Sequence, residues 1–341
     1  MSRSIWRSLN SSSQDDVPHR ILNTIGDTFA QSARSILESI GETEYATLTQ
    51  EKLVVKVPAV SILIVGLGLR VDKQVIDAGK CLTIIATPTT GIDHIDSAYA
   101  RKKGITVLSL RGETAFLKRI TATAELALGL LLALVRKIPA AHTSVLRNEW
   151  NRSAFCGHSL AGKTLGIVGF GRLGSMMGKY GKALGMNVIF TDPKKKGGVP
   201  LTRLLKTADV ISIHVPLTEK TERMIGAKEM KCLKPSALLI NTARGNIVDE
   251  GAILAALKSY HLTGYAADVL ADELSFTPTK ARSALIDFAR THDNVIITPH
   301  IGGTTVEARR ATDMFIAEKL QRVSRYRCAR LSRPYRLHSS R

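Results

Sequence analysis

The sequence contains few cysteines, few aromatic residues and no long apolar stretch. Its four cysteines are scattered over 341 residues without a CxxC pair, which argues against a disulfide framework or a thiolate metal site. No stretch reaches the roughly 20 apolar residues that cross a bilayer, and residues 1–17 lack the apolar centre of a signal peptide. We therefore expect a metal-free protein of the reducing cytoplasm, with no membrane partner.

Acidic residues are scarce relative to basic ones. The chain carries 48 Lys and Arg against 29 Asp and Glu, and residues 321–341 contain seven arginines and no acid. A basic arm can bind nucleic acid or an anionic surface, but aromatic residues make up only 5% of the chain and no nucleic-acid module is visible. We therefore interpret the basic end as a solvated, disordered tail and expect no nucleic-acid partner.

Apolar runs typical of strands alternate with helical patterns along most of the chain. This alternation predicts an α/β protein with parallel sheets, and 341 residues are enough for two domains. We expect two Rossmann-like or flavodoxin-like domains with an interdomain cleft, where ligands prefer to bind. The expected division is a disordered N-terminus (1–18), a substrate domain (19–117, completed by 301–322), a nucleotide domain (118–300) and the basic tail (323–341).

A glycine triplet follows the apolar run 165–168 near the middle of the chain. The first glycine, Gly169, permits a tight turn, Gly171 lets the backbone approach a pyrophosphate, and Gly174 lets the next helix pack closely. The free N–H groups at the start of that helix favour phosphate oxygens. Asp192 follows a second apolar run and is placed to bind a ribose hydroxyl. This context predicts a bound NAD.

Two features complicate the interpretation of this motif. Gly66 and Gly68 form a similar turn after another apolar run, but Val71 occupies the position of the third glycine. Three consecutive lysines, 194–196, follow Asp192 and would attract the 2′-phosphate of NADP. Because an aspartate at the ribose repels that phosphate, NAD remains the favoured cofactor.

Three ionisable residues follow predicted strands in the second half of the chain: Arg244, Glu273 and His300. In a doubly wound sheet, the carboxyl ends of the strands face the nucleotide. Each residue alone also has a non-catalytic explanation. Arg244 could form a surface ion pair, Glu273 could be a solvated carboxylate, and His300 could be a structural histidine before two glycines. Together, and beside the glycine triplet, they predict a catalytic group.

Several segments resemble signatures of the D-isomer-specific 2-hydroxyacid dehydrogenases, a family that includes phosphoglycerate, glyoxylate and D-lactate dehydrogenases. The resemblance is carried by residues 241–250 (NTARGNIVDE) and 298–303 (TPHIGG), with support from 93–96 (DHID) and 214–218 (HVPLT). It extends over residues 20–320. It implies an NAD-dependent oxidoreductase that interconverts a small D-2-hydroxy acid and its 2-keto acid.

The resemblance also implies roles for individual residues. Arg244 holds the substrate carboxylate and polarises the carbonyl, and His300 gives or takes the proton with Glu273 beside it. A glutamate rather than a glutamine at position 273 argues against formate as the substrate. The cofactor-binding residues implied are Gly169, Gly171, Arg172, Leu173, Gly174, Asp192, His214, Val215, Pro216, Thr242, Ala243, Asp268, Gly302 and Gly303. The substrate-binding residues implied are Gly66, Leu67, Thr90 and Gly91, together with Arg244 and His300.

Two further expectations follow from the resemblance. Many relatives carry a basic residue at the position of Gly66, so a phosphorylated substrate loses one contact here. A homodimer is implied, formed through a long helix at residues 120–137 and the loop after it. Two alternatives stay open. One is an NAD-sensing corepressor of the same fold, which the basic tail slightly favours, since fold alone does not decide function. The other is an inactive or damaged family member, suggested by the shortened segment after Asp192 and by the Arg-rich tail.

Overall fold

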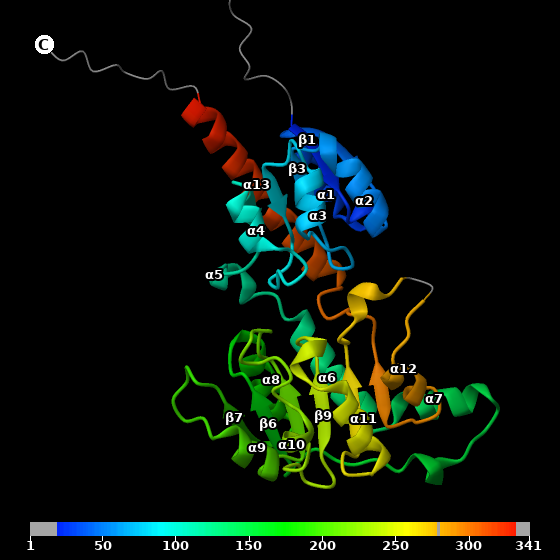
Figure 1. Cartoon of the computed structure of the whole chain (residues 1–341). Helices are drawn as coiled ribbons and strands as arrows, with labels where there is room; N and C mark the ends of the chain where they lie inside the picture. The colour runs from blue at the N-terminus through cyan, green and yellow to red at the C-terminus, as the bar shows by residue number, and fades with distance from the viewer. Residues whose placement is uncertain (1–18, 278–279, 332–341) are drawn as a thin grey trace, which may run out of the picture. The chain divides into compact units, whose positions relative to one another are not determined.

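The computed structural model describes residues 19–277 and 280–331, which form two compact units (Figure 1). Unit 1 combines the chain up to Leu110 with the chain from Arg310 onward, whereas unit 2 is the continuous stretch Arg111–Arg309. Unit 2 is therefore inserted between two parts of unit 1.

Unit 1 is built on a parallel sheet of five strands in the order β2-β1-β3-β4-β5. All neighbouring strands pair in parallel, and an order of 2-1-3-4-5 is that of flavodoxin-like folds. The prediction of a flavodoxin-like parallel sheet is thereby confirmed. The strands are β1 (His19–Asn23), β2 (Gly41–Tyr45), β3 (Ile62–Ile64), β4 (Ile84–Ala86) and β5 (Thr106–Leu108).

Helices cover this sheet, and short polar side chains fix where some of them begin. The Asp72 carboxylate accepts a hydrogen bond from the Val75 N–H at 3.1 Å, and Asp96 accepts one from the Tyr99 N–H at 2.9 Å. Each bond satisfies a free N–H group of a first helical turn. The helices are α1 (Gln31–Glu38), α2 (Gln50–Lys56), α3 (Lys73–Ala78) and α4 (Ser97–Lys102), with 3-10 turns η1 (Gly26–Thr28) and η2 (Val57–Ala59).

A long C-terminal helix, α13 (Val306–Leu331), completes the core of unit 1. Its Ile316 and Leu320 are fully buried in one cluster with residues of β1, β3 and β4, and Figure 1 shows the helix beside that sheet. The helix continues to Leu331, so the prediction of a disordered tail from residue 323 is wrong for residues 323–331. Residues 1–18 and 332–341, also predicted to be disordered, lie outside the described residues.

Unit 2 is built on a six-stranded parallel sheet in the order β11-β10-β9-β8-β6-β7. The chain order reverses between β6 and β8, and such a switch point opens a crevice at the carboxyl ends of the strands. The strands are β6 (Thr164–Val168), β7 (Asn187–Thr191), β8 (Val210–Ile213), β9 (Leu238–Asn241), β10 (Gly264–Ala267) and β11 (Val295–Ile297).

The edge strand β7 has no regular neighbour on its outer side. The described chain forms no strand between Thr191 and Leu201, and the Val199 N–H donates a single hydrogen bond to the Phe190 carbonyl oxygen at 2.8 Å. The short basic segment after Asp192 therefore adds no strand to the sheet and joins β7 through this one backbone hydrogen bond.

The helix expected over residues 120–137 is α6, and it is apolar on almost every side. Its Leu130, Leu131 and Leu134 are buried, and it packs against α8 and β10, as a helix without a polar face must. The helices of unit 2 are α5 (Thr114–Leu117), α6 (Ala122–Val135), α7 (Ile138–Leu146), α8 (Arg172–Ala183), α9 (Leu201–Thr207), α10 (Ala227–Met230), α11 (Glu250–Lys258) and α12 (Ala284–Ala289). The 3-10 turns are η3 (Arg152–Phe155), η4 (Gly245–Ile247) and η5 (Glu273–Ser275).

The described residues contain neither a helix that could cross a membrane nor a cluster of possible metal ligands. None of the helices in 19–277 and 280–331 has both the length and the apolar character needed to cross a membrane. In the same part of the chain, no three His, Cys, Asp or Glu side chains are gathered so that they could hold a metal ion.

The burial of α13 generates a stability prediction. Truncating Ile316 to Ala leaves a cavity under β3, which we expect to cost unit 1 about 2–5 kcal/mol. Hydrogen exchange read by mass spectrometry checks this: β1 and β3 should exchange faster, whereas β6 and β9 of unit 2 should not change. Glu318→Ala, on the exposed side of the same helix, is the control. Unchanged exchange in β3 would show that α13 contributes little to the core.

Candidate active site

The glycine triplet forms the turn between β6 and α8, and two of its members are required by packing. Gly169 has φ +92°, and a Cβ there would lie 2.7 Å from Val215 Cγ1. A Cβ on Gly174 would lie 2.0 Å from the Gly169 carbonyl oxygen. Gly171 is different, because a Cβ there would meet nothing within 4 Å. The turn therefore leaves open space where a pyrophosphate would approach.

The first turn of α8 is also suited to an anion. Gly171 is the N-cap residue and provides no side chain to accept from the first N–H groups. Those groups point out of a 12-residue helix whose dipole is positive at this end. The backbone of Arg172 and Leu173, at the start of α8, thus fits the phosphates of a dinucleotide.

Asp192 braces this turn from the end of β7. Its Oδ2 accepts from the Phe170 N–H at 2.9 Å, and its Oδ1 accepts from the Lys194 N–H at 2.8 Å. The Phe170 and Phe190 rings stack with centroids 4.1 Å apart. The carboxylate is thereby held beside the glycine turn, where it fits a ribose hydroxyl, while residues 194–196 are exposed.

The loop after β8 lies on the other side of the switch point, directly against Gly169. It begins with His214, whose Nε2 lies 2.8 Å from Ser212 Oγ. Burial lowers the pKa of His214 to about 4, so its ring is neutral at physiological pH. Val215 and Pro216 follow, and the Val215 side chain lies against the glycine turn at Gly169.

A close pair of ionisable side chains in unit 2 joins His300 and Glu273. His300 Nδ1 lies 2.6 Å from Glu273 Oε1, and Glu273 Oε2 accepts from the Leu270 N–H at 3.1 Å. Within the described part of the chain, no hydrogen bond occupies His300 Nε2. The imidazole is therefore oriented through one nitrogen and free to exchange a proton through the other.

A buried carboxylate holds the His300 loop in an uncommon backbone conformation. His300 has φ +54°, a left-handed value that few non-glycine residues adopt. Asp268, which is 1% exposed, accepts from Thr298 Oγ1 at 2.6 Å, the Ile301 N–H at 2.8 Å and the Gly302 N–H at 2.7 Å. Burial raises the pKa of Asp268, against the effect of these bonds. Whether Asp268 also accepts from a nicotinamide stays a prediction.

Arg244 follows β9 and lies at the same edge of the sheet as Glu273 and His300. The β9-β10-β11 pairing makes the three loops neighbours. Arg244 Nη1 donates to the Ala243 carbonyl oxygen at 2.7 Å, and buried Asn241 donates through Nδ2 to the Arg244 carbonyl oxygen at 2.9 Å. A Cβ on Gly245 would lie 2.1 Å from the Leu270 carbonyl carbon, so the loops after β9 and β10 touch.

Thr242, in the same loop, has a side chain whose polar atom is unpaired within the described residues. Its hydroxyl is buried and has no hydrogen-bond partner among the described residues. Buried polar atoms are normally paired, so this hydroxyl fits a polar group of the cofactor.

The other predicted substrate residues lie in unit 1, at the carboxyl ends of β3 and β4. Leu67 is 44% exposed, and a Cβ on Gly66 would lie 3.3 Å from Ile25 Cγ1. In the loop after β4, Thr89 Oγ1 donates to the Gly91 carbonyl oxygen at 2.7 Å, beside Thr90. The structure therefore brings Gly66, Leu67, Thr90 and Gly91 to one edge of the unit 1 sheet.

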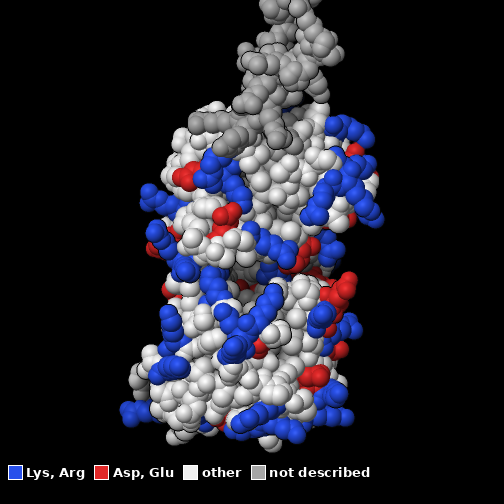
Figure 2. Space-filling model, turned by 90° about the vertical axis from the view of Figure 1, so that its left-hand side faces the viewer, with Lys and Arg blue, Asp and Glu red and all other residues white. Residues whose placement is uncertain are grey.

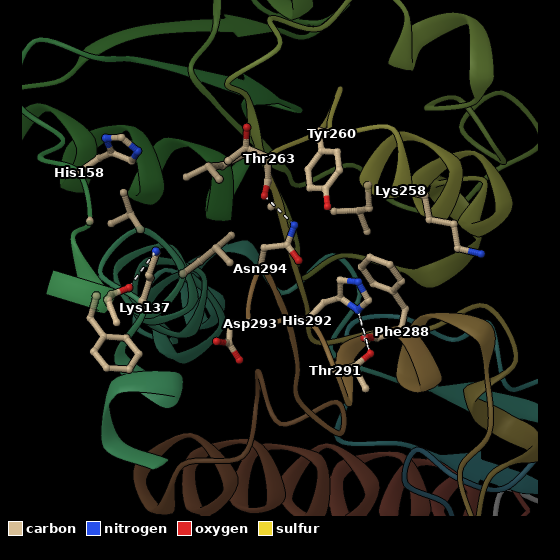
Figure 3. A pocket seen from close by; sticks show the side chains of 18 residues that line it. Lys137, His158, Lys258, Tyr260, Thr263, Phe288, Thr291, His292, Asp293 and Asn294 are labelled. Carbon is tan, nitrogen blue, oxygen red and sulfur yellow. Dashed lines mark hydrogen bonds between the residues drawn. The ribbon is translucent and has the colours of Figure 1, made fainter. Parts of the chain in front are cut away.

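A cavity of unit 2 lies away from this site. It has a volume of about 470 Å³ and is drawn in Figure 3, where Asn294 donates to the Thr263 carbonyl oxygen and the Phe288 and His292 rings stack. Thr263 and Asn294 immediately precede β10 and β11. The cavity thus lies at the amino ends of the strands and contains none of Arg244, Glu273 and His300.

Comparison with known proteins identifies the family. A family model described as the D-isomer specific 2-hydroxyacid dehydrogenase NAD binding domain matches residues 128–302. The chain belongs to this family. It is 36% identical to the hydroxypyruvate reductase of Thermotoga maritima over 304 residues, covering 87% of this chain and 96% of that protein. It is 39% identical to the D-3-phosphoglycerate dehydrogenase of Methanocaldococcus jannaschii over 312 residues, covering 88% of this chain but only 57% of that longer protein.

A solved structure agrees. The D-lactate dehydrogenase of Aquifex aeolicus, complexed with NAD and lactic acid, matches with a TM-score of 0.79 and 27% identity, covering 90% of this chain and 96% of that one. The resemblance noted in the signature segments is thereby confirmed, as is the prediction of NAD, because the matched residues 128–302 lie within unit 2.

Two side chains around this site make three hydrogen bonds that the sequence alone did not indicate. Arg172 Nη1 donates to the carbonyl oxygens of Leu117 and Ile120, and Thr123 Oγ1 donates to that of Gly302. The partners are 52 to 179 positions apart in sequence, so no local pattern could predict these hydrogen bonds. The sequence showed only that an arginine and a threonine lie near the starts of two helices.

The open space at Gly171 yields a binding prediction. Gly171→Ala adds one methyl group where the protein leaves room, so folding should be unaffected while the affinity for NADH falls by at least about tenfold, or about 1.4 kcal/mol. A fluorescence titration with NADH and a thermal melt check both parts. Gly129→Ala in α6, where a Cβ also meets nothing within 4 Å, is the control. Wild-type affinity in Gly171→Ala would place the pyrophosphate elsewhere.

Proposed function

We propose that this protein interconverts a small D-2-hydroxy acid and its 2-keto acid in an NAD-dependent reaction. The observation that carries the proposal is the His300–Glu273 pair, 2.6 Å apart, in a loop next to that of Arg244 within an NAD-binding unit. NAD, when bound, supplies or accepts the hydride at C2 of the substrate. Gly169, Gly171, Arg172, Leu173, Asp192, Val215 and Thr242 would hold it.

His300 is the acid and base in this proposal. The Glu273 carboxylate accepts the Nδ1 proton and so fixes which nitrogen faces the substrate. Nε2 then gives a proton to the carbonyl oxygen during reduction and removes the hydroxyl proton during oxidation. The negative charge of Glu273 stabilises the imidazolium that forms in the second case.

Arg244 is the substrate anchor. Its guanidinium is a planar set of fixed donors that matches a carboxylate and polarises the neighbouring carbonyl. One hydrogen bond, from Asn241 Nδ2 to the Arg244 carbonyl oxygen, holds the residue in place, and Gly245 lets the loop after β10 pack closely against it. An anionic substrate also suits the surface, since Figure 2 shows a face on which Lys and Arg predominate over Asp and Glu.

The proton-transfer role is tested by His300→Gln. Without the imidazole, kcat/KM for the reduction of 2-keto acids should fall by about two to four orders of magnitude, while NADH affinity stays near that of the wild type. NADH oxidation is followed by absorbance with a panel of 2-keto acids. His292→Gln, which removes an exposed imidazole of the same unit, is the control. Wild-type turnover in His300→Gln would refute the assignment.

The unit 1 loop suggests the substrate class. Gly66 and Leu67 place no charge at the end of β3, and Leu67 is largely exposed. We propose that the substrate is unphosphorylated, like the hydroxypyruvate named for the Thermotoga maritima relative.

A direct competition tests the substrate class. With NADH, hydroxypyruvate or pyruvate should be reduced with a kcat/KM at least tenfold above that of 3-phosphohydroxypyruvate, because a phosphate dianion without a cation partner is poorly stabilised. The double variant Gly66→Arg with Leu67→Ser should narrow this ratio. A preference of the wild type for the phosphorylated acid would overturn the proposal.

A homodimer and a reducing compartment complete the proposal. Four apolar residues in and after α7 are exposed: Ile138, Val145, Leu146 and Trp150. Exposed apolar residues close together in the sequence favour an interface here, and light scattering gives the mass that tests the dimer.

The cysteines fit a reducing compartment. Cys81, Cys156 and Cys232 are free thiols, as in cytoplasmic proteins.

A further inference from the structure

The side chain of Arg172 makes contacts that its place in the phosphate turn does not require. Its backbone opens α8, but its Nη1 donates to the Leu117 carbonyl oxygen at 3.1 Å and also to that of Ile120. These carbonyls belong to the end of α5 and to the residues leading into α6. The guanidinium is partly buried, which lowers its pKa without discharging it. The phosphate turn is thus tied to the segment 117–120.

The chain that follows this segment, at the start of α6, contacts the His300 loop. Thr123, in the first turn of α6, donates through Oγ1 to the Gly302 carbonyl oxygen at 3.0 Å. A Cβ on Gly302 would lie 3.1 Å from Thr123 Cγ2 and 2.9 Å from Asp268 Oδ2. The helix start, the Asp268 carboxylate and the loop that carries His300 are therefore packed without free space.

We infer that the segment 117–123 is a strut between the pyrophosphate turn and the His300 loop, with the Arg172 guanidinium and the Thr123 hydroxyl as its two end contacts. Both are positioning residues that set the imidazole relative to the cofactor. The inference rests on the proposed role of His300.

A direct ionic role of Arg172 toward phosphate makes a different prediction. Loss of a phosphate contact weakens NADH binding and leaves Thr123 irrelevant. Loss of a strut contact slows the chemical step at saturating NADH, because misplacing a reacting group by a fraction of an ångström is costly. The rate losses of the two substitutions are then not additive in free energy, because both residues act on the rate through the same segment.

The experiment is a double-mutant cycle with Arg172→Met and Thr123→Val, read by single-turnover stopped-flow reduction of a 2-keto acid at saturating NADH. Each single variant should slow the chemical step by about 5- to 50-fold, with the Kd for NADH of Thr123→Val within twofold of wild type. The double variant should be no slower than the slower single variant. Thr123→Ser, which keeps the hydroxyl, should restore the rate.

Matched controls are available in the same unit. Lys179→Met removes another cation from α8, and Thr207→Val removes a hydroxyl that donates only within α9; neither should change the rate. Multiplicative losses in the double variant would overturn the strut, as would an Arg172→Met variant that loses NADH affinity but keeps the wild-type rate. So would wild-type rates in both single variants.

A second measurement separates failure of the strut from failure of the proposed function. NADH bound at the pyrophosphate turn should slow amide exchange at residues 298–303 in the wild type, and Thr123→Val should abolish this protection while still binding NADH. This readout needs no turnover. A wild type that shows the protection but reduces no keto acid would refute the proposed function alone, whereas protection retained in Thr123→Val would refute the strut alone.

Discussion

The candidate active site depends on one buried carboxylate. Asp268 accepts three hydrogen bonds from residues 298–302, and these bonds hold His300 at a positive φ. Burying a carboxylate is unfavourable unless it is well hydrogen-bonded, and three donors at 2.6–2.8 Å meet that condition. The direction of the imidazole, its pairing with Glu273 and the contact between Gly302 and Thr123 all follow from this arrangement.

Apolar and glycine patterns were enough to predict much of this structure from sequence. The inner strands of both sheets, such as β3, β4 and β8, are largely apolar runs because they are buried on both faces. The turn at Gly169 was recognisable because glycine spacing reflects close backbone approaches, which the packing at Gly169 and Gly174 confirms. Arg244, Glu273 and His300 were recognisable because they follow strands, and the sheet order explains why they share an edge.

What the sequence did not reveal depends on exposure or on distance. Strand β2 has the sequence GETEY and lies at the edge of its sheet, so its partly exposed side chains show no apolar run. The helix over residues 323–331 was hidden by its arginines, which resemble a solvated tail. The contacts of Asp268, Arg172 and Thr123 join positions far apart in the chain, and no local pattern records such pairs.

The insertion of unit 2 into unit 1 has a consequence for synthesis. All of unit 2 lies between residues 111 and 309, so it can fold as soon as that stretch has left the ribosome. Unit 1 begins first but finishes last, because the apolar face of β1 and β3 stays uncovered until Ile316 and Leu320 arrive. Closing that long loop is slow compared with local folding. In the nascent chain, the sheet of unit 1 therefore keeps one apolar face uncovered until after the whole of unit 2 has been made.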